Sequence, residues 1–265
     1  MKLKTWLNEW IIVYKKPFVK PHTVANIKSV INMHVPQRLL ITELSLINAI
    51  DIQRALNNVK LSRTRLDLYD IFNSSFSIAY RSGLIKLDIS SLLIKPKHKK
   101  EVGQALTSDE IVKFIGAISG QRLYYYYMFC LLSGCRRSEA LSLRWDDIDE
   151  VSGLIHIRGT KTEASNRYIP YFNEIRELLK PLKRNTVKVF NHRADYVSKE
   201  FVKYCSNHSL KDLRHTFATR CLECGINIKV VQKWLGHTRL DTTANIYTHV
   251  QNDFVLEESE KFSLL

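Results

Sequence analysis

Basic side chains, a histidine and a tyrosine follow one another near the carboxyl end of this 265-residue chain, in an order that suits chemistry on a phosphate ester. Lys211 and Arg214 come first, and His237 and Tyr247 follow them. Cleaving a phosphodiester without a metal requires cations for the charge on the non-bridging oxygens, a nucleophile, and an acid for the leaving oxygen. A guanidinium binds phosphate through two parallel hydrogen bonds and keeps its charge at any working pH. These residues therefore predict a site that binds a phosphodiester and attacks it.

Two earlier segments could complete such a site. The first offers Arg136 as a second arginine, and the other offers Lys161 in a turn between two short strands. The motifs are Gly-Cys-Arg-Arg-Ser-Glu at 134–139, Thr-Lys-Thr at 160–162, Lys-Asp-Leu-Arg-His at 211–215, Leu-Gly-His at 235–237 and Thr-Thr-x-x-x-Tyr-x-His at 242–249. Together they resemble the tyrosine recombinases, the phage integrase family, over nearly the whole chain.

This resemblance implies a reaction and a role for each residue. Tyr247 would attack phosphorus, leaving a 3′-phosphotyrosyl bond and a free 5′-hydroxyl. Arg136 and Arg214 would bind the phosphate, and His237 would bind it beside the nucleophile. Lys161 would protonate the departing 5′-oxygen. The resemblance implies no metal and no other cofactor.

Two further positions have supporting roles in the same resemblance. Glu139 matches an acidic position that orients the arginines of the site. Lys211 stands where the family has histidine or lysine, and lysine is a poorer base than imidazole unless its pKa is lowered. His215 is not the equivalent of that position, because it is next to Arg214 and points to another side of the helix. We expect His215 to be a hydrogen-bonded packing residue.

Twelve tyrosines compete for the role of nucleophile. The run at 124–127 is the most conspicuous, but four consecutive helical residues face all round the helix axis and cannot converge on one phosphate. Most of this run is therefore expected in the core or in an interface. The motif around Tyr247 is what singles that residue out.

Two other classes of function compete with a recombinase. Asp146, Asp147, Asp149 and Glu150 could hold magnesium in a metal-dependent nuclease, but acidic turns are ordinary and nothing elsewhere completes a metal site. A DNA-binding regulator could share the fold and lack catalysis. The usable side chains at all the candidate positions argue against that second class.

The charge of the chain points to a polyanionic partner. Its formal net charge is +14, and residues 1–100 hold 17 Lys and Arg against 6 Asp and Glu, which favours nucleic acid or an anionic surface. No apolar run approaches the roughly 18 residues of a membrane span, so we expect a cytoplasmic protein without a membrane partner. Five scattered cysteines indicate reduced thiols, and Cys221 and Cys224 are expected to be small buried hydrophobic residues.

The hydrophobic pattern predicts a mainly α-helical protein with a small antiparallel β-sheet. Apolar residues at helical spacing predict helices over residues 5–14, 23–34, 46–58, 63–82 and about 121–132. Capping-box spacing predicts helices that begin after Thr107, with Glu110 reaching back, and around Leu210, after Ser209 and with Asp212 reaching back. Alternating residues predict strands at 154–157 and 167–170.

The stretch 95–100 is charged, contains proline and lacks apolar rhythm, which indicates a linker. We therefore expect a helical core-DNA-binding domain over 1–94, a linker over 95–104, and a tyrosine-recombinase-like catalytic domain over 105–265. Many phage integrases have a small arm-binding domain ahead of the first of these, and none is visible here, so we expect either an enzyme that uses simple core sites or a sequence that begins after such a domain.

The resemblance also implies partners and a setting. Double-stranded DNA would be the substrate, and a homotetramer would assemble on two recombination sites, with accessory DNA-bending proteins possible. The C-terminal segment 254–265, which ends in an apolar patch at 262–265, could dock on a neighbour or on its own subunit. The expected role is integration or excision of a mobile element or prophage, and a Xer-like resolvase of replicon dimers is the alternative.

Overall fold

The computed structural model describes residues 1–98, 103–159 and 166–236 of the chain. Its residues form two compact units, Met1–Glu101 and Val102–Leu265, and each is described by itself. None of the helices in the described residues is both long enough and apolar enough to cross a bilayer.

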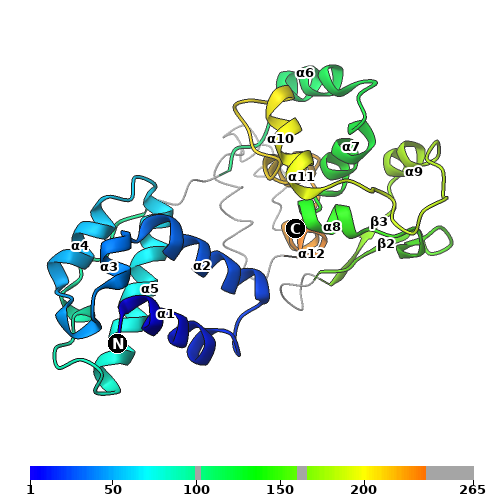
Figure 1. Cartoon of the computed structure of the whole chain (residues 1–265). Coiled ribbons are helices and arrows are strands. Elements are labelled where there is room, and N and C mark those ends of the chain that lie inside the picture. Colours follow the sequence, from blue (N-terminus) through cyan, green and yellow to red (C-terminus); the bar gives the residue numbers. More distant parts are fainter. Residues whose placement is uncertain (99–102, 160–165, 237–265) are drawn as a thin grey trace, which may run out of the picture. The chain divides into compact units, whose positions relative to one another are not determined.

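The first unit is helical throughout its described part (Figure 1). Its elements are α1 (Leu3–Trp10), the π-helical turn η1 (Ile11–Lys15), α2 (Pro21–His34), α3 (Gln37–Ile41), η2 (Leu44–Leu46), α4 (Ala49–Asn57), α5 (Ser62–Arg81) and η3 (Ser90–Leu92). Helix α1 buries Leu3, Trp6, Leu7 and Trp10, which recur at helical spacing on one face. These side chains share one core with the buried face of α5.

The helices of this unit lie close to where the hydrophobic pattern predicted them. The predicted helix over 5–14 is α1 followed without a break by η1, so the helical path starts two residues earlier and its last turns widen to π geometry. The predicted helix over 46–58 starts only at Ala49, where the Asn48 side chain accepts a hydrogen bond from the backbone N–H of Asp51. The short α3 was not predicted, because five residues are too few to show a period.

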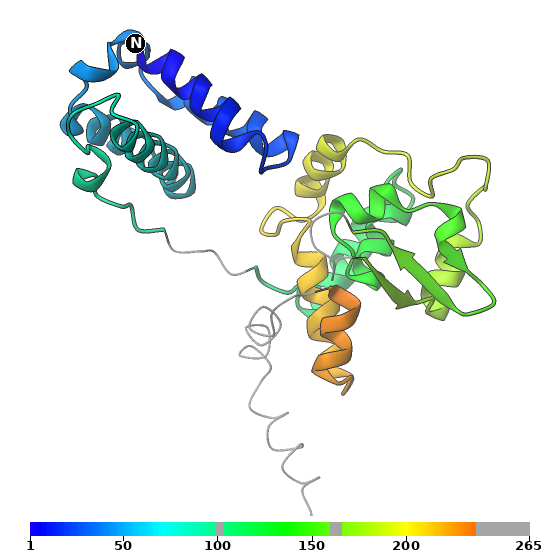
Figure 2. The ribbon, with the colours of Figure 1, turned by 90° about the horizontal axis from the view of Figure 1, so that it is seen from below.

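The second unit is mainly helical with one small sheet, as predicted (Figure 2). Its elements are α6 (Ser108–Ile118), α7 (Tyr124–Ser133), α8 (Arg137–Ser142), η4 (Trp145–Asp147), β1 (Ile148–Asp149), β2 (Leu154–Ile157), β3 (Arg167–Pro170), α9 (Asn173–Leu179), α10 (Ala194–Tyr204), α11 (Asp212–Glu223) and α12 (Ile228–Leu235). Helix α7 contacts α8, α9 and α11, and α12 contacts α11 and β3.

The predicted capping box at the start of α6 is confirmed. The Thr107 hydroxyl accepts a hydrogen bond from the backbone N–H of Glu110, and the Glu110 carboxylate accepts one from the backbone N–H of Thr107. Two N–H groups that the helix itself cannot satisfy are thereby paired.

The sheet has the order β1-β2-β3, and all of its pairs are antiparallel. Strands β2 and β3 have the predicted bounds, and the short β1 was not predicted. In the register of β2 and β3, Ile157 pairs with Arg167 and Ile155 with Ile169. All four of these side chains are buried. An arginine therefore occupies a position on the covered face of the sheet.

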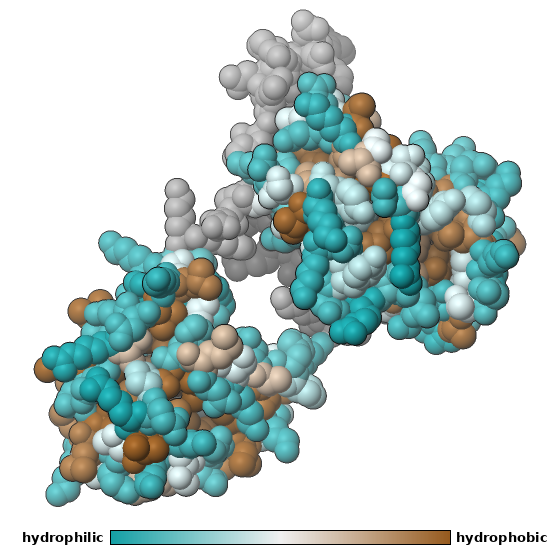
Figure 3. Space-filling model, turned by 45° about the horizontal axis from the view of Figure 1, so that its top comes forward, coloured by the Kyte–Doolittle hydropathy of each residue, from teal (hydrophilic) through white to brown (hydrophobic). Residues whose placement is uncertain are grey.

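Polar residues cover most of the surface seen in Figure 3, with hydrophobic residues in scattered spots. The most exposed hydrophobic residues of the first unit include Phe18 and Met33, which are 81% and 74% exposed.

Gly134 lies at the point where three helices of the second unit meet. It ends α7 in the left-handed conformation, with φ of 61°, which glycine adopts without steric cost. A Cβ atom there would lie 2.5 Å from the Phe217 ring on α11 and 2.8 Å from the Leu235 side chain on α12. Only a glycine lets α7 end this close to both helices.

We expect Gly134→Ala to lower the free energy of unfolding by about 2–5 kcal/mol, because it combines a left-handed backbone with overpacking. Gly120→Ala is the matched control, since Gly120 has φ of 71° and open space around its Cα, and it should cost only about 1–2 kcal/mol. Urea denaturation followed by circular dichroism measures both. Equal losses would show that the close approach at Gly134 has no energetic weight.

Candidate functional site

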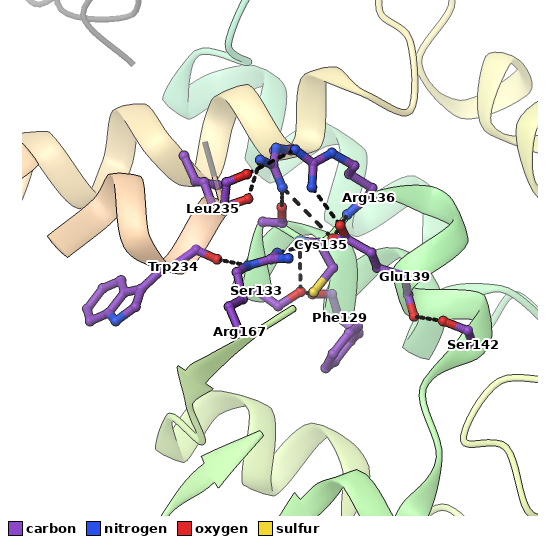
Figure 4. A network of polar contacts seen from close by, with 12 residues as sticks. Phe129, Ser133, Cys135, Arg136, Glu139, Ser142, Arg167, Trp234 and Leu235 are labelled. Atoms are coloured by element: carbon purple, nitrogen blue, oxygen red, sulfur yellow. Dashed lines mark hydrogen bonds and ion pairs between the residues drawn. The ribbon is translucent and has the colours of Figure 1, made fainter. Parts of the chain in front are cut away.

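Three arginines converge on one buried carboxylate in the second unit (Figure 4). Glu139 Oε1 accepts a hydrogen bond from Arg136 Nη1 at 2.6 Å, and Glu139 Oε2 accepts one from Arg167 Nη2 at 3.1 Å. Arg214 Nη1 lies 4.0 Å from the same Oε2. The group carries three formal positive charges and one negative charge, so it has a surplus of positive charge to offer an anion.

Each of these side chains is placed by the end of a secondary structure element. Arg136 is the residue before α8, and Glu139 lies in the first turn of α8, where its carboxylate also accepts from the Arg136 backbone N–H at 2.9 Å. Arg167 is the first residue of β3, and Arg214 lies in the first turn of α11. Three chain segments, the starts of α8, β3 and α11, therefore meet around one carboxylate.

The C-terminal end of α12 closes the cluster from another side. The carbonyl oxygen of Trp234 accepts from Arg167 Nε, that of Leu235 accepts from Arg214 Nη2 at 2.5 Å, and that of Gly236 accepts from Arg136 Nη2 at 3.4 Å. The last carbonyls of a helix have no partner within the helix and carry the negative end of its dipole. Three successive carbonyls thus bind the three guanidinium groups.

Burial and neighbouring charges shift the pKa values of Arg214 and Glu139. Burial lowers the pKa of Arg214 to about 9, and the charges of Arg136 and Arg167 act in the same direction, against Glu139. Burial alone would raise the pKa of the Glu139 carboxyl, but the charge of Arg167 and the hydrogen bonds from Arg167 and Arg136 outweigh it and hold that pKa below its usual range. At neutral pH the Arg214 guanidinium and the Glu139 carboxylate are therefore both charged.

The three arginines differ in their access to solvent. The Arg136 side chain is 36% exposed, whereas those of Arg214 and Arg167 are 8% and 4% exposed. Arg214 also donates from Nη1 to the carbonyl of Gly134 at 2.9 Å. A ligand that approaches from solvent therefore meets Arg136 first, while Arg167 lies deepest.

The structure brings together three of the residues that the sequence singled out. Arg136, Glu139 and Arg214 form the cluster. Lys211 is exposed and immediately precedes α11. Lys161, His237 and Tyr247 lie outside the described residues, although Gly236 of the cluster directly precedes His237 in the sequence.

The start of α11 differs in detail from its prediction. The helix begins at Asp212, two residues later than expected. The Asp212 carboxylate accepts from the Ser209 backbone N–H and hydroxyl, so the Ser209 hydroxyl donates to a side chain and does not cap a backbone N–H. One half of the predicted capping box is present, and the other is replaced by a backbone turn from the Ser209 carbonyl to the Asp212 N–H.

His215 is half-buried, and its expected side-chain hydrogen bond is absent. Its Nε2 has no hydrogen-bond partner among the described residues. The ring instead lies against Gly103, where a Cβ atom would come within 2.4 Å of it. Burial lowers the pKa of His215, and the charge of Lys211 adds to this effect. The prediction of a packing residue was correct, and the prediction of a hydrogen bond was wrong.

The tyrosine run of α7 is mostly core, as predicted. Tyr126 and Tyr127 are fully buried, and their hydroxyls donate to the carbonyls of Arg137 and Val197. Burial raises the pKa of both phenols above the usual range. Neither phenol is placed to act as a nucleophile.

The acidic residues proposed for a metal nuclease have other partners. Asp147 is buried and accepts from Arg158, Glu150 pairs with Arg184, and Asp149 accepts from two backbone N–H groups of the following turn. In the described ranges no three His, Cys, Asp or Glu side chains are grouped so that they could hold a metal. Of the cysteine pair, Cys221 is buried as expected, whereas Cys224, which directly follows α11, is exposed and corrects that expectation.

Arg167 belongs to the cluster but was not singled out from the sequence. It was expected only as the first residue of a strand. The sequence did contain an indication of this burial. Arg167 lies two residues before Ile169 in β3, so its side chain must point to the same covered face. A buried arginine requires paired partners, and these come from α8 and α12, which are distant in the sequence.

We expect Glu139→Gln to lower the free energy of unfolding by about 3–5 kcal/mol at pH 7, because it leaves buried arginines without their counter-charge. Since the folded-state pKa of Glu139 is lowered, its contribution is fully present above its ordinary pKa of 4.5 and is lost as the pH falls through the lowered value. The difference between the two proteins should therefore shrink in strong acid. Urea denaturation across pH tests this, with the exposed Glu174→Gln as control, and a constant difference would contradict it.

Comparison with known proteins places the chain in a family. Residues 104–253 match the model described as Phage integrase family, and residues 2–59 match the one described as Phage integrase, N-terminal SAM-like domain. The first match covers more than half of the chain.

Named relatives and a solved structure agree with this. The chain is 32% identical to tyrosine recombinase XerA of Pyrococcus horikoshii over 65% of its own length and 66% of the relative's, and 30% identical to tyrosine recombinase XerC of Thermodesulfovibrio yellowstonii over 71% of each. A lambda integrase tetramer bound to a Holliday junction has a similar fold, with a TM-score of 0.78 and 20% identity over 93% of this chain and 77% of that one. The chain therefore belongs to the phage integrase family of tyrosine-type site-specific recombinases.

Proposed function

We propose that this protein cleaves and rejoins double-stranded DNA at specific sites through a 3′-phosphotyrosyl intermediate on Tyr247. The observation that carries the proposal is the cluster of Arg136 and Arg214 around Glu139 at the end of α12. A phosphodiester needs a site of this kind, with preorganised positive charge in a partly dry environment. The resemblance of the motifs around Lys161, His237 and Tyr247 to those of the family supplies the remaining groups.

The proposed reaction conserves the phosphodiester energy. The Tyr247 phenolic oxygen attacks phosphorus and gives its proton to water, the bond from phosphorus to the 5′-oxygen breaks, and Lys161 gives a proton to that oxygen. The phosphate stays on Tyr247 and on the 3′-oxygen. Ligation is the same exchange in reverse, with a 5′-hydroxyl as nucleophile, so no cofactor is consumed.

The arginines act on the charge that develops on the non-bridging oxygens. Arg136 is the more accessible, and Arg214 is fixed from behind by the carbonyls of Gly134 and Leu235. Fixed donors need no reorganisation when the pentavalent state forms. His237 follows Gly236 directly, and we propose that it binds the same phosphate. Lys211, in the residue before α11, adds positive charge at a helix N-terminus.

The biological role has two candidates. Integration or excision of a mobile element is supported by the match of residues 2–59 to an N-terminal domain of phage integrases. Xer-like resolution of replicon dimers is supported by the relatives named XerA and XerC, which are 30% or more identical. Attachment-like repeats beside the gene would favour the first role, and a chromosome-dimer site would favour the second.

We further propose that four copies assemble on two DNA sites, with accessory DNA-bending proteins where the sites need them. The lambda integrase that shares this fold is a tetramer on a Holliday junction. The excess of positive charge in residues 1–100 would bind phosphates, so DNA affinity should fall steeply with salt.

Tyr247→Phe should abolish the covalent protein–DNA complex on a nicked suicide substrate and leave site binding intact, because it removes only the attacking oxygen. Denaturing gel electrophoresis detects the adduct, and mobility shift measures binding. A DNA-binding regulator would form no adduct even in its unaltered form. A metal-dependent nuclease would be inhibited by EDTA and would release free ends, so either of these outcomes would contradict the proposal.

Arg214→Ala should slow cleavage by a factor on the order of a hundred or more, as removal of one preorganised charge donor does. Arg220→Ala is the matched control, because Arg220 lies on the same helix and pairs only with Glu223 and Ser108 among the partners resolved for it. Single-turnover kinetics on the suicide substrate measure both variants. Similar rates in the two variants would place Arg214 outside the reaction.

A further inference from the structure

Arg167 is the one cluster arginine that the comparison of motifs assigns no role. It is the first residue of β3 and the deepest of the three, with a side chain 4% exposed. It contacts two elements at once, since Nη2 donates to Glu139 on α8 and Nε donates to the carbonyl of Trp234 on α12. Figure 4 shows it between these two partners.

The elements that Arg167 joins are those from which the proposed catalytic groups extend. Strand β3 follows the segment that contains Lys161, and α12 is followed directly by His237 and then by Tyr247. Glu139 is the carboxylate that holds Arg136 and faces Arg214. One buried side chain thus connects the start of β3, the carboxylate and the end of α12.

We propose that Arg167 is a positioning residue of the strand-cleavage reaction, which couples β3 and the C-terminal end of α12 to the carboxylate that orients Arg136 and Arg214. It does not touch DNA, because its guanidinium is buried and at least two of its donors are taken by protein oxygens. The inference rests on the proposed function.

Two consequences follow from this geometry. Without Arg167, the carbonyl of Trp234 loses a partner, and the guanidinium hydrogen bonds to the end of α12 that remain are those to Leu235 and Gly236. Glu139 also loses the neighbour whose charge does most to hold its pKa down. Among the described residues, the charged groups that then still face Glu139 are Arg136 from the start of α8 and Arg214 from α11, with the thiol of Cys135 nearby.

The experiment compares Arg167→Met with Arg167→Lys, which keeps the charge but not the planar fork that reaches two acceptors. Arg158→Met is the matched control. Arg158 follows β2 on the same sheet and pairs with the buried carboxylate of Asp147 at 2.5 Å, so its loss also leaves a buried acid without an arginine.

The first readout needs no DNA. Hydrogen–deuterium exchange in the last turn of α12 should be faster in Arg167→Met than in the unaltered protein and in Arg158→Met, with α10 as internal reference. Unchanged exchange in this turn would overturn the coupling to α12, whatever the protein does to DNA.

The second readout is the pH profile of covalent-complex formation on the suicide substrate. Arg167→Met should slow cleavage on the order of a hundredfold, the effect of a small misplacement, with little change in the DNA concentration for half-saturation. The acid limb of the pH profile of Arg167→Met should lie at higher pH, because Glu139 protonates more readily. Arg167→Lys should restore part of the cleavage rate and return the acid limb to its original pH. Arg158→Met should keep the acid limb in place.

The outcomes separate this inference from the proposed function. If the unaltered protein forms no adduct, the proposed function fails, and the exchange experiment still decides whether Arg167 holds α12. If the adduct forms and Arg167→Met keeps the rate and pH profile of Arg158→Met, the positioning role is wrong. Should Arg167→Met fail to fold, Arg167→Lys decides the question. A normal cleavage rate in Arg167→Lys, with a higher DNA concentration for half-saturation, would count against the inference.

Discussion

The second unit depends on one carboxylate that neutralises part of a buried cluster of arginines. Removing a guanidinium from water costs several kcal/mol unless charge and hydrogen bonds replace its hydration. Glu139 supplies the charge, and backbone carbonyls supply most of the other acceptors. Because the compensation is only partial, the cluster keeps a net positive charge, which makes it costly for the fold and useful for binding an anion.

The same requirement explains why so many elements end at this point. A helix carbonyl accepts most readily from a guanidinium where it has no partner within its own helix, which favours arginines near helix ends. Helix α7 ends at Gly134, whose left-handed backbone and missing side chain let its carbonyl reach Arg214. Helix α12 ends at Gly236, also left-handed, with φ of 64°. Two glycine-terminated helices and the first turns of α8 and α11 therefore enclose the site.

This arrangement also distributes the arginines by depth. Arg136 is the most accessible, Arg214 is mostly covered, and Arg167 is buried behind them. Phosphate chemistry needs donors that are both accessible and fixed, and a single shell of surface arginines would be mobile. The buried layer holds the outer one in place, so a residue that never meets the substrate can still influence how fast it reacts.

The sequence alone determined the features that depend on residues close together in the chain. The capping box at Thr107 and the strands at 154–157 and 167–170 follow from local geometry, whereas the role of Glu139 beside Arg136 was implied by the family resemblance. It also indicated the family, because the motifs place unusual residue types in a fixed order. It missed the five-residue α3. It was also wrong about the cap of α11, because the Ser209 hydroxyl donates to the Asp212 carboxylate and does not accept from a backbone N–H.

Only the tertiary structure decided which distant residues complete the site. Arg167 lies 28 residues from Glu139, Arg214 lies 80 residues from the carbonyl of Gly134, and Arg136 lies 100 residues from that of Gly236. Hydrophobic period and capping patterns describe neighbours within a few residues, whereas these contacts depend on how α7, α11, α12 and the sheet pack together. The arginine of β3 looked like an ordinary strand residue until packing placed it beside a carboxylate from another element.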